Sequence, residues 1–336
     1  MNPHATLSQG DAVLRQAIAA AAQAPSQYNS QPWRFVLGRS RVDVRLDRAR
    51  ALPVVDPEHR EQVIACGAAL LHLRVALGAQ GYGHAVKRLP DLADPDLLAT
   101  VTLSGRAVPT EAGRRLFEAI PKRHTQRGEF FGMSVPEDLM ARFREACAEE
   151  GARFDAIAGE GPRARLIALV MAADHLEWSD RRYRDELSLW TRSNHSDARD
   201  GVFGYTEGVS DAASLLRPLV LKSFNRGERE AEAHQAAMEA SPLLAVLTTA
   251  SDDRRAWLHC GEALERVLLE AADDGVMASF LSGVVESGET RAELRRMLSE
   301  LGVDGHPQVV LRMGYSAAGP ASPRRGVDEV TDIDPS

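Results

Sequence analysis

The sequence predicts an α+β fold in which two related halves of one chain pack against each other. Helical and strand patterns alternate along its 336 residues, a segment of the first half recurs in the second, and residues 177–235 match neither copy. A chain of this length is sufficient for two domains of ordinary size. We therefore expect a first half over residues 1–110 and a second half over residues 111–336, with an insertion at about 177–235.

The first half carries the patterns of two helices and three strands. Apolar residues recur at helical spacing until Pro25, and a later segment is apolar almost all round, as in a buried helix. Runs of strand-forming residues flank a turn near Gly38–Ser40. The expected helices are 11–23 and 61–80, and the expected strands are two within 33–47 and one over 99–105.

The second half repeats this mixture of elements. Gly151 ends its first expected helix, and the run 241–250 reads as a buried strand. We expect the tail over 318–330 to be extended. The expected helices are 136–151, 162–176 and 257–273, and the expected strands are 152–159, 241–250 and 306–315.

The recurring segments are residues 60–81 and 254–275, which align without gaps at an offset of 194. Two of the three cysteines, Cys66 and Cys260, fall in register, and each is followed by glycine. Two buried helices of similar composition are the alternative to a true repeat. We interpret the match as an internal duplication whose two long helices pack on each other. The identical pairs are Arg60 and Arg254, Cys66 and Cys260, Gly67 and Gly261, Ala69 and Ala263, Leu70 and Leu264, and Gly81 and Gly275.

Residues 177–235 are charged and carry several aromatic residues, among them those of GVFGYTEG at 201–208. Long insertions in compact domains often form lids or binding loops. We expect this insertion to be a candidate lid.

Composition argues against several classes of protein. The net charge of −8 disfavours general binding to nucleic acid or to an anionic membrane. From the sequence, no apolar run is expected to reach the roughly 20 residues of a membrane-spanning helix, and no secretory signal is visible. The three cysteines form no disulfide framework or paired metal motif, so a reducing cytoplasm is the expected compartment. The ten histidines are scattered, and no metal site is expected.

Three segments carry residues suited to chemistry. APSQYNSQPW at 24–33 combines amides, hydroxyls and an indole in a way that is unusual for a plain turn. KRHTQRGEF at 122–130 and SPRRGVDEV at 322–330 offer guanidinium groups, which pair well with phosphate. Taken singly, the second segment could be a solvated basic turn and the third a surface charge pair.

Together the three segments resemble the nitroreductase superfamily of FMN-dependent flavoproteins. APSQYNSQPWRF resembles its PSxxNxQPW loop, and RHTQR resembles its RxSxR-like segment, which grips the flavin phosphate. SPLLAVLTTA with CGEALERVLLEAADDGV resembles its strand and long helix, and PQVVLRMGY with PRR resembles its last strand and second phosphate clamp. The resemblance covers most of the chain outside 177–235 and implies a nitroreductase-like fold.

The distribution of these motifs departs from the ordinary family pattern. Ordinary members form dimers in which each flavin site takes the loop from one subunit and the basic segments from the other. Here the first half holds the loop and the second half holds both basic segments. We infer a monomer that mimics the family dimer and keeps one flavin site, a pattern that is similar to the Acg-like branch.

The resemblance also implies roles for individual residues. Ser26 and Asn29 would bond the ribityl chain or ring edge, Arg127 would lie near the pyrimidine edge, and Ser282 would face flavin N5. The family commonly has an acidic residue at the Ser282 position, so its absence puts the usual N5 contact in doubt. The expected cofactor-binding residues are Pro25, Ser26, Gln27, Asn29, Arg123, His124, Thr125, Arg127, Ser282, Gly283, Arg324 and Arg325.

The function that the resemblance implies is FMN-dependent oxidoreduction. Electrons would pass from NADH, NADPH or another donor through FMN to a quinone, nitro compound or similar small-molecule acceptor. No side chain is expected to act as a catalytic acid or base. The alternative is a flavin-sequestering or FMN-storage protein, because the aromatic residues of the insertion could cover the flavin. Another flavin reaction and a flavin-free relative also stay open.

Overall fold

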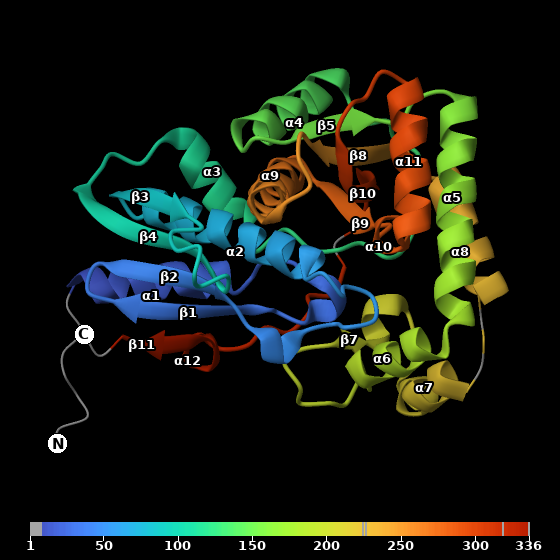
Figure 1. Ribbon diagram of the computed structural model, residues 1–336, viewed down its shortest axis with the longest axis horizontal. Coiled ribbons are helices and arrows are strands. Elements are labelled where there is room, and N and C mark those ends of the chain that lie inside the picture. Colours follow the sequence, from blue (N-terminus) through green and yellow to red (C-terminus); the bar gives the residue numbers. More distant parts are fainter. Residues whose placement is uncertain (1–8, 224, 226, 318, 335–336) are drawn as a thin grey trace.

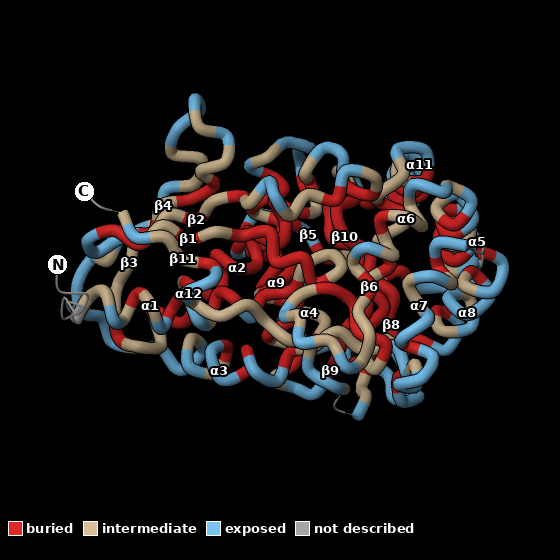
Figure 2. The backbone as a smooth tube through the Cα atoms, turned by 90° about the horizontal axis from the view of Figure 1, so that it is seen from below, coloured by how far each residue is buried: buried red, intermediate tan, exposed pale blue. Residues whose placement is uncertain are grey.

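Two β-sheets lie on either side of a central pair of long helices in the computed structural model (Figure 1). The structure describes residues 9–334 except 224, 226 and 318. The central helices are α2 (Arg60–Ala79) and α9 (Arg254–Asp273), which match the two helices expected from the repeat. Figure 2 shows that burial is concentrated along these helices and the inner strands, while exposed residues form the rim.

The two sheets share one topology. The first sheet has the order β11-β1-β2-β4-β3 and the second has the order β5-β8-β10-β9. Without β11, each sheet places its first, second, fourth and third strands side by side, all antiparallel, with the long helix between the second and third. The strands are β1 (Trp33–Gly38), β2 (Arg41–Leu46), β3 (Tyr82–Arg88), β4 (Leu97–Arg106), β5 (Arg153–Ala156), β8 (Leu243–Thr249), β9 (Val276–Phe280), β10 (His306–Tyr315) and β11 (Thr331–Ile333). An internal duplication would produce this repeated order.

The central helices cross where the duplicated glycines meet. A Cβ atom placed on Gly67 would lie 2.2 Å from the carbonyl oxygen of Leu258 and 2.9 Å from the Cα of Gly261. A Cβ atom placed on Gly261 would lie 1.9 Å from the carbonyl oxygen of Ile64. Because no other residue lacks a Cβ, only glycine at both positions allows the two backbones to approach this closely.

Helix α2 corrects one expectation. It is long and apolar enough to cross a membrane by length and composition alone, although 83% of its apolar window is buried inside the protein. The core helix of a soluble protein passes the same test, and here α2 packs between the first sheet and α9. Its composition therefore reflects burial on all sides, as the sequence pattern indicated.

Further helices cover these layers. The first half contains α1 (Gln9–Ala21), and α3 (Glu111–Ala119) packs on both central helices. The second half contains α4 (Glu137–Glu149), α10 (Gly283–Glu286) and α11 (Gly288–Glu300). Neither β3, α3 nor α11 was expected from the sequence.

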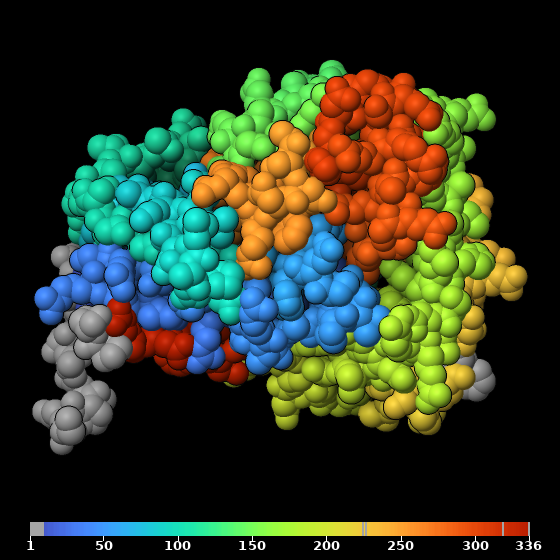
Figure 3. All heavy atoms as spheres, in the orientation of Figure 1, coloured from blue at the N-terminus to red at the C-terminus, as the bar shows by residue number. Residues whose placement is uncertain are grey.

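The chain between β5 and β8, residues 157–242, holds the insertion expected at 177–235 together with the helix expected over 162–176. In the structure this whole segment is the insertion. In the first half a two-residue turn joins the corresponding strands β1 and β2, so the insertion occupies the place of a turn. Figure 3 shows its yellow-green atoms against the blue atoms of the first half. Its elements are α5 (Glu160–Ser179), α6 (Arg181–Trp190), β6 (Thr191–Arg192), β7 (Val202–Phe203), α7 (Asp211–Ser223) and α8 (Gly227–Glu239).

The C-terminal tail crosses to the first sheet. Strand β11 runs parallel to β1, with Phe35 opposite Thr331. The expectation of an extended tail is wrong over α12 (Val327–Val330), a single helical turn. Glu329 closes this turn by accepting a hydrogen bond from the backbone N–H of Gly326 at 2.6 Å. The tail thereby joins the two halves.

We predict that Gly261→Ala destabilises the protein by at least about 2 kcal/mol, because the added methyl group overpacks the helix crossing. The matched control is Gly78→Ala in α2, where an added Cβ meets nothing within 4 Å. That variant should be neutral or gain about 0.5–1 kcal/mol from helix propensity. Urea unfolding of both variants measures the difference, and equal stabilities would contradict the proposed crossing.

Candidate functional site

A cavity of about 810 Å³ lies where both halves and the insertion meet. Its volume falls in the range of cofactor and ligand sites. The first half contributes residues 25–29 and one face of α2, and the second half contributes residues 125–128 and 279–283. The insertion closes the remaining side with residues of α5 to α8. Segments far apart in the sequence thus build one site.

Most of the residues expected to bind a cofactor line this cavity, and three do not. Arg123, His124 and Arg325 lie outside its lining. The expected residues that line it are Pro25, Ser26, Gln27, Asn29, Thr125, Arg127, Ser282, Gly283 and Arg324.

The loop at 25–31 has an unusual backbone. Tyr28, Asn29 and Gln31 have φ angles of 50°, 53° and 52°, which lie in a left-handed region that residues other than glycine rarely adopt. Ser26 stabilises the loop, because its Oγ accepts a hydrogen bond from the backbone N–H of Gln31 at 2.8 Å. Such strained residues persist only where the surroundings hold them, and they gather at functional sites.

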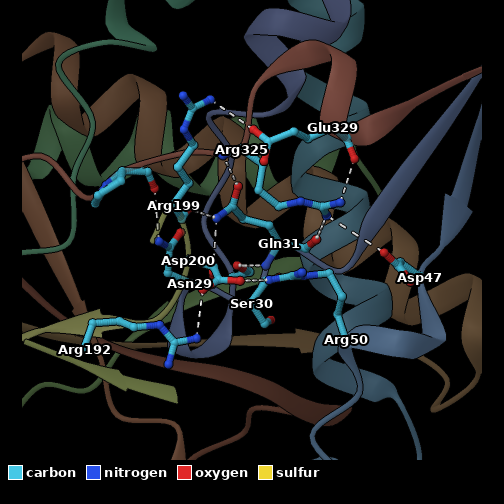
Figure 4. Close-up of polar contacts among 12 residues, drawn as sticks. Asn29, Ser30, Gln31, Asp47, Arg50, Arg192, Arg199, Asp200, Arg325 and Glu329 are labelled. Carbon is cyan, nitrogen blue, oxygen red and sulfur yellow. Dashed lines mark hydrogen bonds and ion pairs between the residues drawn. The ribbon is translucent and has the colours of Figure 1, made fainter. Parts of the chain in front are cut away.

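Gln31 is the residue that holds the loop to its neighbours (Figure 4). Its Nε2 donates to the carbonyl oxygen of Arg199 in the insertion at 2.7 Å. Its Oε1 accepts from the backbone N–H of Arg325 in the tail at 2.8 Å. One buried amide therefore connects the loop, the insertion and the tail.

Arg324 and Arg325 point in different directions. Arg325 lies on the Gln31 side, where Nη2 donates to the carbonyl oxygen of Glu329 at 2.7 Å and Nη1 lies 3.9 Å from Asp47 (Figure 4). Arg324 lines the cavity, and its Nη1 donates to Oδ1 of Asn29 at 3.0 Å. The cavity therefore receives one guanidinium from this pair.

The charge of Arg324 is poorly compensated. Burial, followed by the positive charge of Arg123, lowers the pKa of Arg324 to about 9. The Nε atoms of Arg123 and Arg324 are both buried without a hydrogen-bond partner in the described part of the chain. Glu265 is the nearby acid, with Oε1 3.2 Å from Nε of Arg123, but it also faces His72 at 2.6 Å. An anion in the cavity would compensate the positive charge of Arg324.

The segment 122–128 is fixed along β9 and β10. His124 donates from Nδ1 to the carbonyl oxygen of Lys122 at 3.0 Å and accepts at Nε2 from the N–H of Gly319 at 2.8 Å, so it anchors the tail. Arg312 of β10 donates to the carbonyl oxygen of Arg127 at 2.9 Å. Burial lowers the pKa of Arg127, whose Nε lies 3.7 Å from Glu207.

Comparison with known proteins identifies the family. Residues 53–315 match the family model described as Nitroreductase family. This chain belongs to the nitroreductase family. The match confirms the resemblance predicted from the sequence, although its range excludes the loop at 24–33 that first suggested it.

Two relatives from Mycobacterium tuberculosis strain H37Rv are similar over nearly the whole chain. The protein named "Uncharacterized protein Rv3127" is 33% identical over 332 residues, which cover 96% of this chain and 93% of that protein. The protein named "Putative NAD(P)H nitroreductase acg" is 31% identical over 337 residues, which cover 96% of each chain. The second relative confirms the Acg-like branch.

Solved structures give more distant matches. The FMN-dependent nitroreductase NfnB from Mycobacterium smegmatis in complex with NADPH is 17% identical, with a TM-score of 0.41. The match covers 67% of this chain and 98% of that chain. The family match and the mixture of helices and sheets confirm the predicted α+β class and nitroreductase-like fold. The pseudo-dimer and the lid stay predictions.

The sequence analysis of this nitroreductase-family protein missed an acidic wall of the cavity. Glu286 of α10 accepts a hydrogen bond at Oε1 from Nε2 of Gln27 at 2.6 Å. Glu177 of α5 and Tyr183 of α6 also line the cavity, and both come from the insertion. Glu286 stands one helical turn after Ser282, a signal that could have found it, whereas nothing in the sequence pointed to Glu177.

We predict that Gln31→Leu lowers the free energy of unfolding by roughly 2–3 kcal/mol, because it leaves the Arg199 carbonyl and the Arg325 N–H without partners. Gln235→Leu is the control, since Gln235 is only partly buried and its side chain bonds only Glu239 among the described residues. That change should stay within about 0.5 kcal/mol. Urea unfolding measures both. If Gln31→Leu leaves the free energy of unfolding unchanged, the Gln31 side chain does not hold the loop.

Proposed function

We propose that this protein is an FMN-dependent oxidoreductase that passes electrons from NADH or NADPH to a quinone, a nitro compound or a similar acceptor. The observation that carries the proposal is Arg324, a half-buried arginine that lines the cavity. Its Nε is buried with no hydrogen-bond partner among the described residues, and its pKa is lowered to about 9. A phosphate would compensate this charge through charged hydrogen bonds. The residues therefore fit a phosphate-bearing cofactor.

Each part of the cavity suits a part of FMN. Arg324 and Thr125 would hold the phosphate, and Ser26 with Asn29 would hold the ribityl chain or the ring edge. Small and apolar side chains give the ring a wall without polar groups, namely those of Ile64, Ala65, Ala68 and Leu264. Arg127 is a cation in a poorly solvated position and favours an electron-rich ligand beside it. When bound, FMN supplies a redox centre that takes up and releases electrons.

A single chain would complete the site in this proposal. The loop comes from the first half, and the segments around Thr125 and Arg324 come from the second half. The shared strand order of the two sheets and the Gly67–Gly261 crossing support a monomer that mimics a dimer. The name of the acg relative supports a nicotinamide donor. The free, buried cysteines fit a reducing compartment such as the cytoplasm.

We predict that Arg324→Met weakens FMN binding by about tenfold or more, because a charged hydrogen bond contributes about 1.5–3 kcal/mol. Arg325→Met is the matched control, since Arg325 is the next residue in the chain and its guanidinium lies outside the cavity lining. It should change the dissociation constant by less than about threefold. Titration of each apoprotein with FMN, followed by quenching of flavin fluorescence, measures both. Equal dissociation constants for the two variants would refute the phosphate assignment.

A flavin-sequestering protein is the second candidate function. The observation that favours it is the set of insertion residues, Trp178, Tyr183 and Tyr205, that line the cavity and would screen a bound flavin.

Anaerobic titration with NADPH separates the two functions. We expect the visible flavin band to bleach, because a reductase must admit its donor to the cavity. Titration with dithionite is the control for a flavin that can be reduced at all. A band that dithionite bleaches and NADPH and NADH leave unchanged would favour sequestration.

A further inference from the structure

Two carboxyl groups from separate parts of the chain meet on the wall of the cavity. Glu177 belongs to α5 in the insertion, and Glu286 belongs to α10 after β9. A Cβ atom placed on Gly283 would lie 2.6 Å from Oε1 of Glu177, so this carboxyl packs directly on the Gly283 backbone. Glu286 is held in turn by the amide of Gln27. The pair thus touches both segments expected beside the flavin, residues 25–29 and 282–283.

Within the described residues neither carboxyl of the pair forms an ion pair. The cations that act on the pair, Arg60 and His234, have other partners. Arg60 pairs with Glu61 and donates to the carbonyl oxygen of Gln308 at 2.7 Å, while Nδ1 of His234 lies 2.8 Å from Asp174. The titratable or charged groups that interact with the pair are Tyr28, Arg60, Glu61, Asp174, Tyr183 and His234.

Burial and mutual repulsion disfavour the state in which both acids are ionised. Burial, followed by the negative charge of Asp174, raises the pKa of the Glu177 carboxyl to about 7. Burial and the negative charge of Glu177 raise the pKa of Glu286 well above its ordinary value. Neighbouring carboxylates in a poorly solvated site share a proton for the same reason in other enzymes.

We propose that Glu177 and Glu286 hold one proton between them and deliver it to an oxygen atom of a neutral acceptor reduced in the cavity. The oxygen would be the carbonyl oxygen of a quinone or an oxygen of a nitro group. This inference rests on the proposed function, because it assigns a residue role to the same cavity. It also departs from the sequence analysis, which expected no catalytic acid.

The proton balance of quinone reduction requires such a donor. A quinone that becomes a hydroquinone gains two electrons and two protons. Reduced nicotinamide releases two electrons and one proton as a hydride equivalent, so one more proton is needed. In the proposed step a carboxyl O–H bond breaks, an O–H bond forms on the acceptor, and the charge of the pair goes from one negative charge to two. This doubly ionised pair is the unfavourable form, so it takes up a proton again readily. Water at the cavity then returns one proton to the pair.

Infrared spectroscopy tests the shared proton without any cofactor or turnover. Protonated carboxyl groups have a carbonyl-stretch band that carboxylates lack. We expect this band in the wild-type protein near neutral pH, and its loss as pH rises from about 6 to about 9. In Glu177→Gln and Glu286→Gln the remaining carboxyl has lost its like-charged neighbour, so its pKa falls and the band vanishes at lower pH.

Glu207→Gln is the matched control in the same cavity. Glu207 forms an ion pair with Arg217 and is not part of the acid pair, so its removal should leave the band unchanged. Circular dichroism checks that each variant is folded. The shared proton is refuted if the band is absent from the wild type, or if its titration is identical in all four proteins.

Steady-state kinetics tests delivery of the proton to the acceptor. The two acceptors are a benzoquinone, which needs a proton, and ferricyanide, which takes an electron without one. We expect each Gln variant to lower the ratio of quinone kcat to ferricyanide kcat by about tenfold or more. The wild-type ratio should fall as pH rises through the titration of the pair, and the variants should lose this dependence. A ratio that is unchanged in both variants would overturn the role in delivery.

The two proposals fail in different ways. If the protein binds no FMN, or if neither acceptor is reduced, the proposed function fails while the infrared result still reports on the pair. If FMN binds and both acceptors are reduced, yet the ratio and its pH profile match in wild type and variants, the inference fails alone.

Discussion

The close crossing of α2 and α9 at Gly67 and Gly261 is the constraint on which the rest of the structure depends. It sets the distance between the two sheets, because each central helix is the link between the second and third strands of its own sheet. It also sets the cavity wall, since Ile64 and Ala68 of α2 and Leu264 of α9 line the cavity within one turn of the glycines. A side chain at either glycine would separate the halves and reshape the site, so the packing of the core and the geometry of the cavity are one property.

The ionisable residues of the cavity destabilise the fold that holds them. The pKa of Glu177 rises from its ordinary value of 4.5 to about 7, so the unfolded chain releases its proton first as pH rises. This carboxyl therefore costs stability progressively across that interval, and the cost is largest above it. Arg324 acts in the same direction with the opposite charge, because burial disfavours its cation. A fold selected for stability alone would replace such groups, and their concentration around one cavity is typical of a functional site.

The sequence was informative where structure follows from local pattern or from repetition. It predicted α2 and α9 because their burial and their matched glycines recur, and it predicted the loop at 24–33 from its composition. It failed where contacts are non-local. Strand β3 is a half-exposed edge strand with a mixed pattern, and β11 exists because it pairs with β1 across the chain. It could not choose between Arg324 and Arg325, because the two side chains point in different directions and their partners, Asn29 for Arg324 and Gln31 for Arg325, lie far away in the sequence. Glu177 gave no signal, since the insertion has no copy in the first half with which to compare it.

The position of the insertion explains how a covering segment can also take part in chemistry. It replaces a tight turn between two strands, so more than 80 residues could be accommodated without disturbing the order of either sheet. Loops at such positions are tolerated because they leave the core unchanged. Here the inserted α5 carries Glu177 against the backbone of Gly283, opposite an acid from the duplicated core. Without the other carboxyl beside it, neither Glu177 nor Glu286 would have a neighbour with which to share a proton. The pair arises from the meeting of insertion and core, which makes the insertion part of the site as well as its cover.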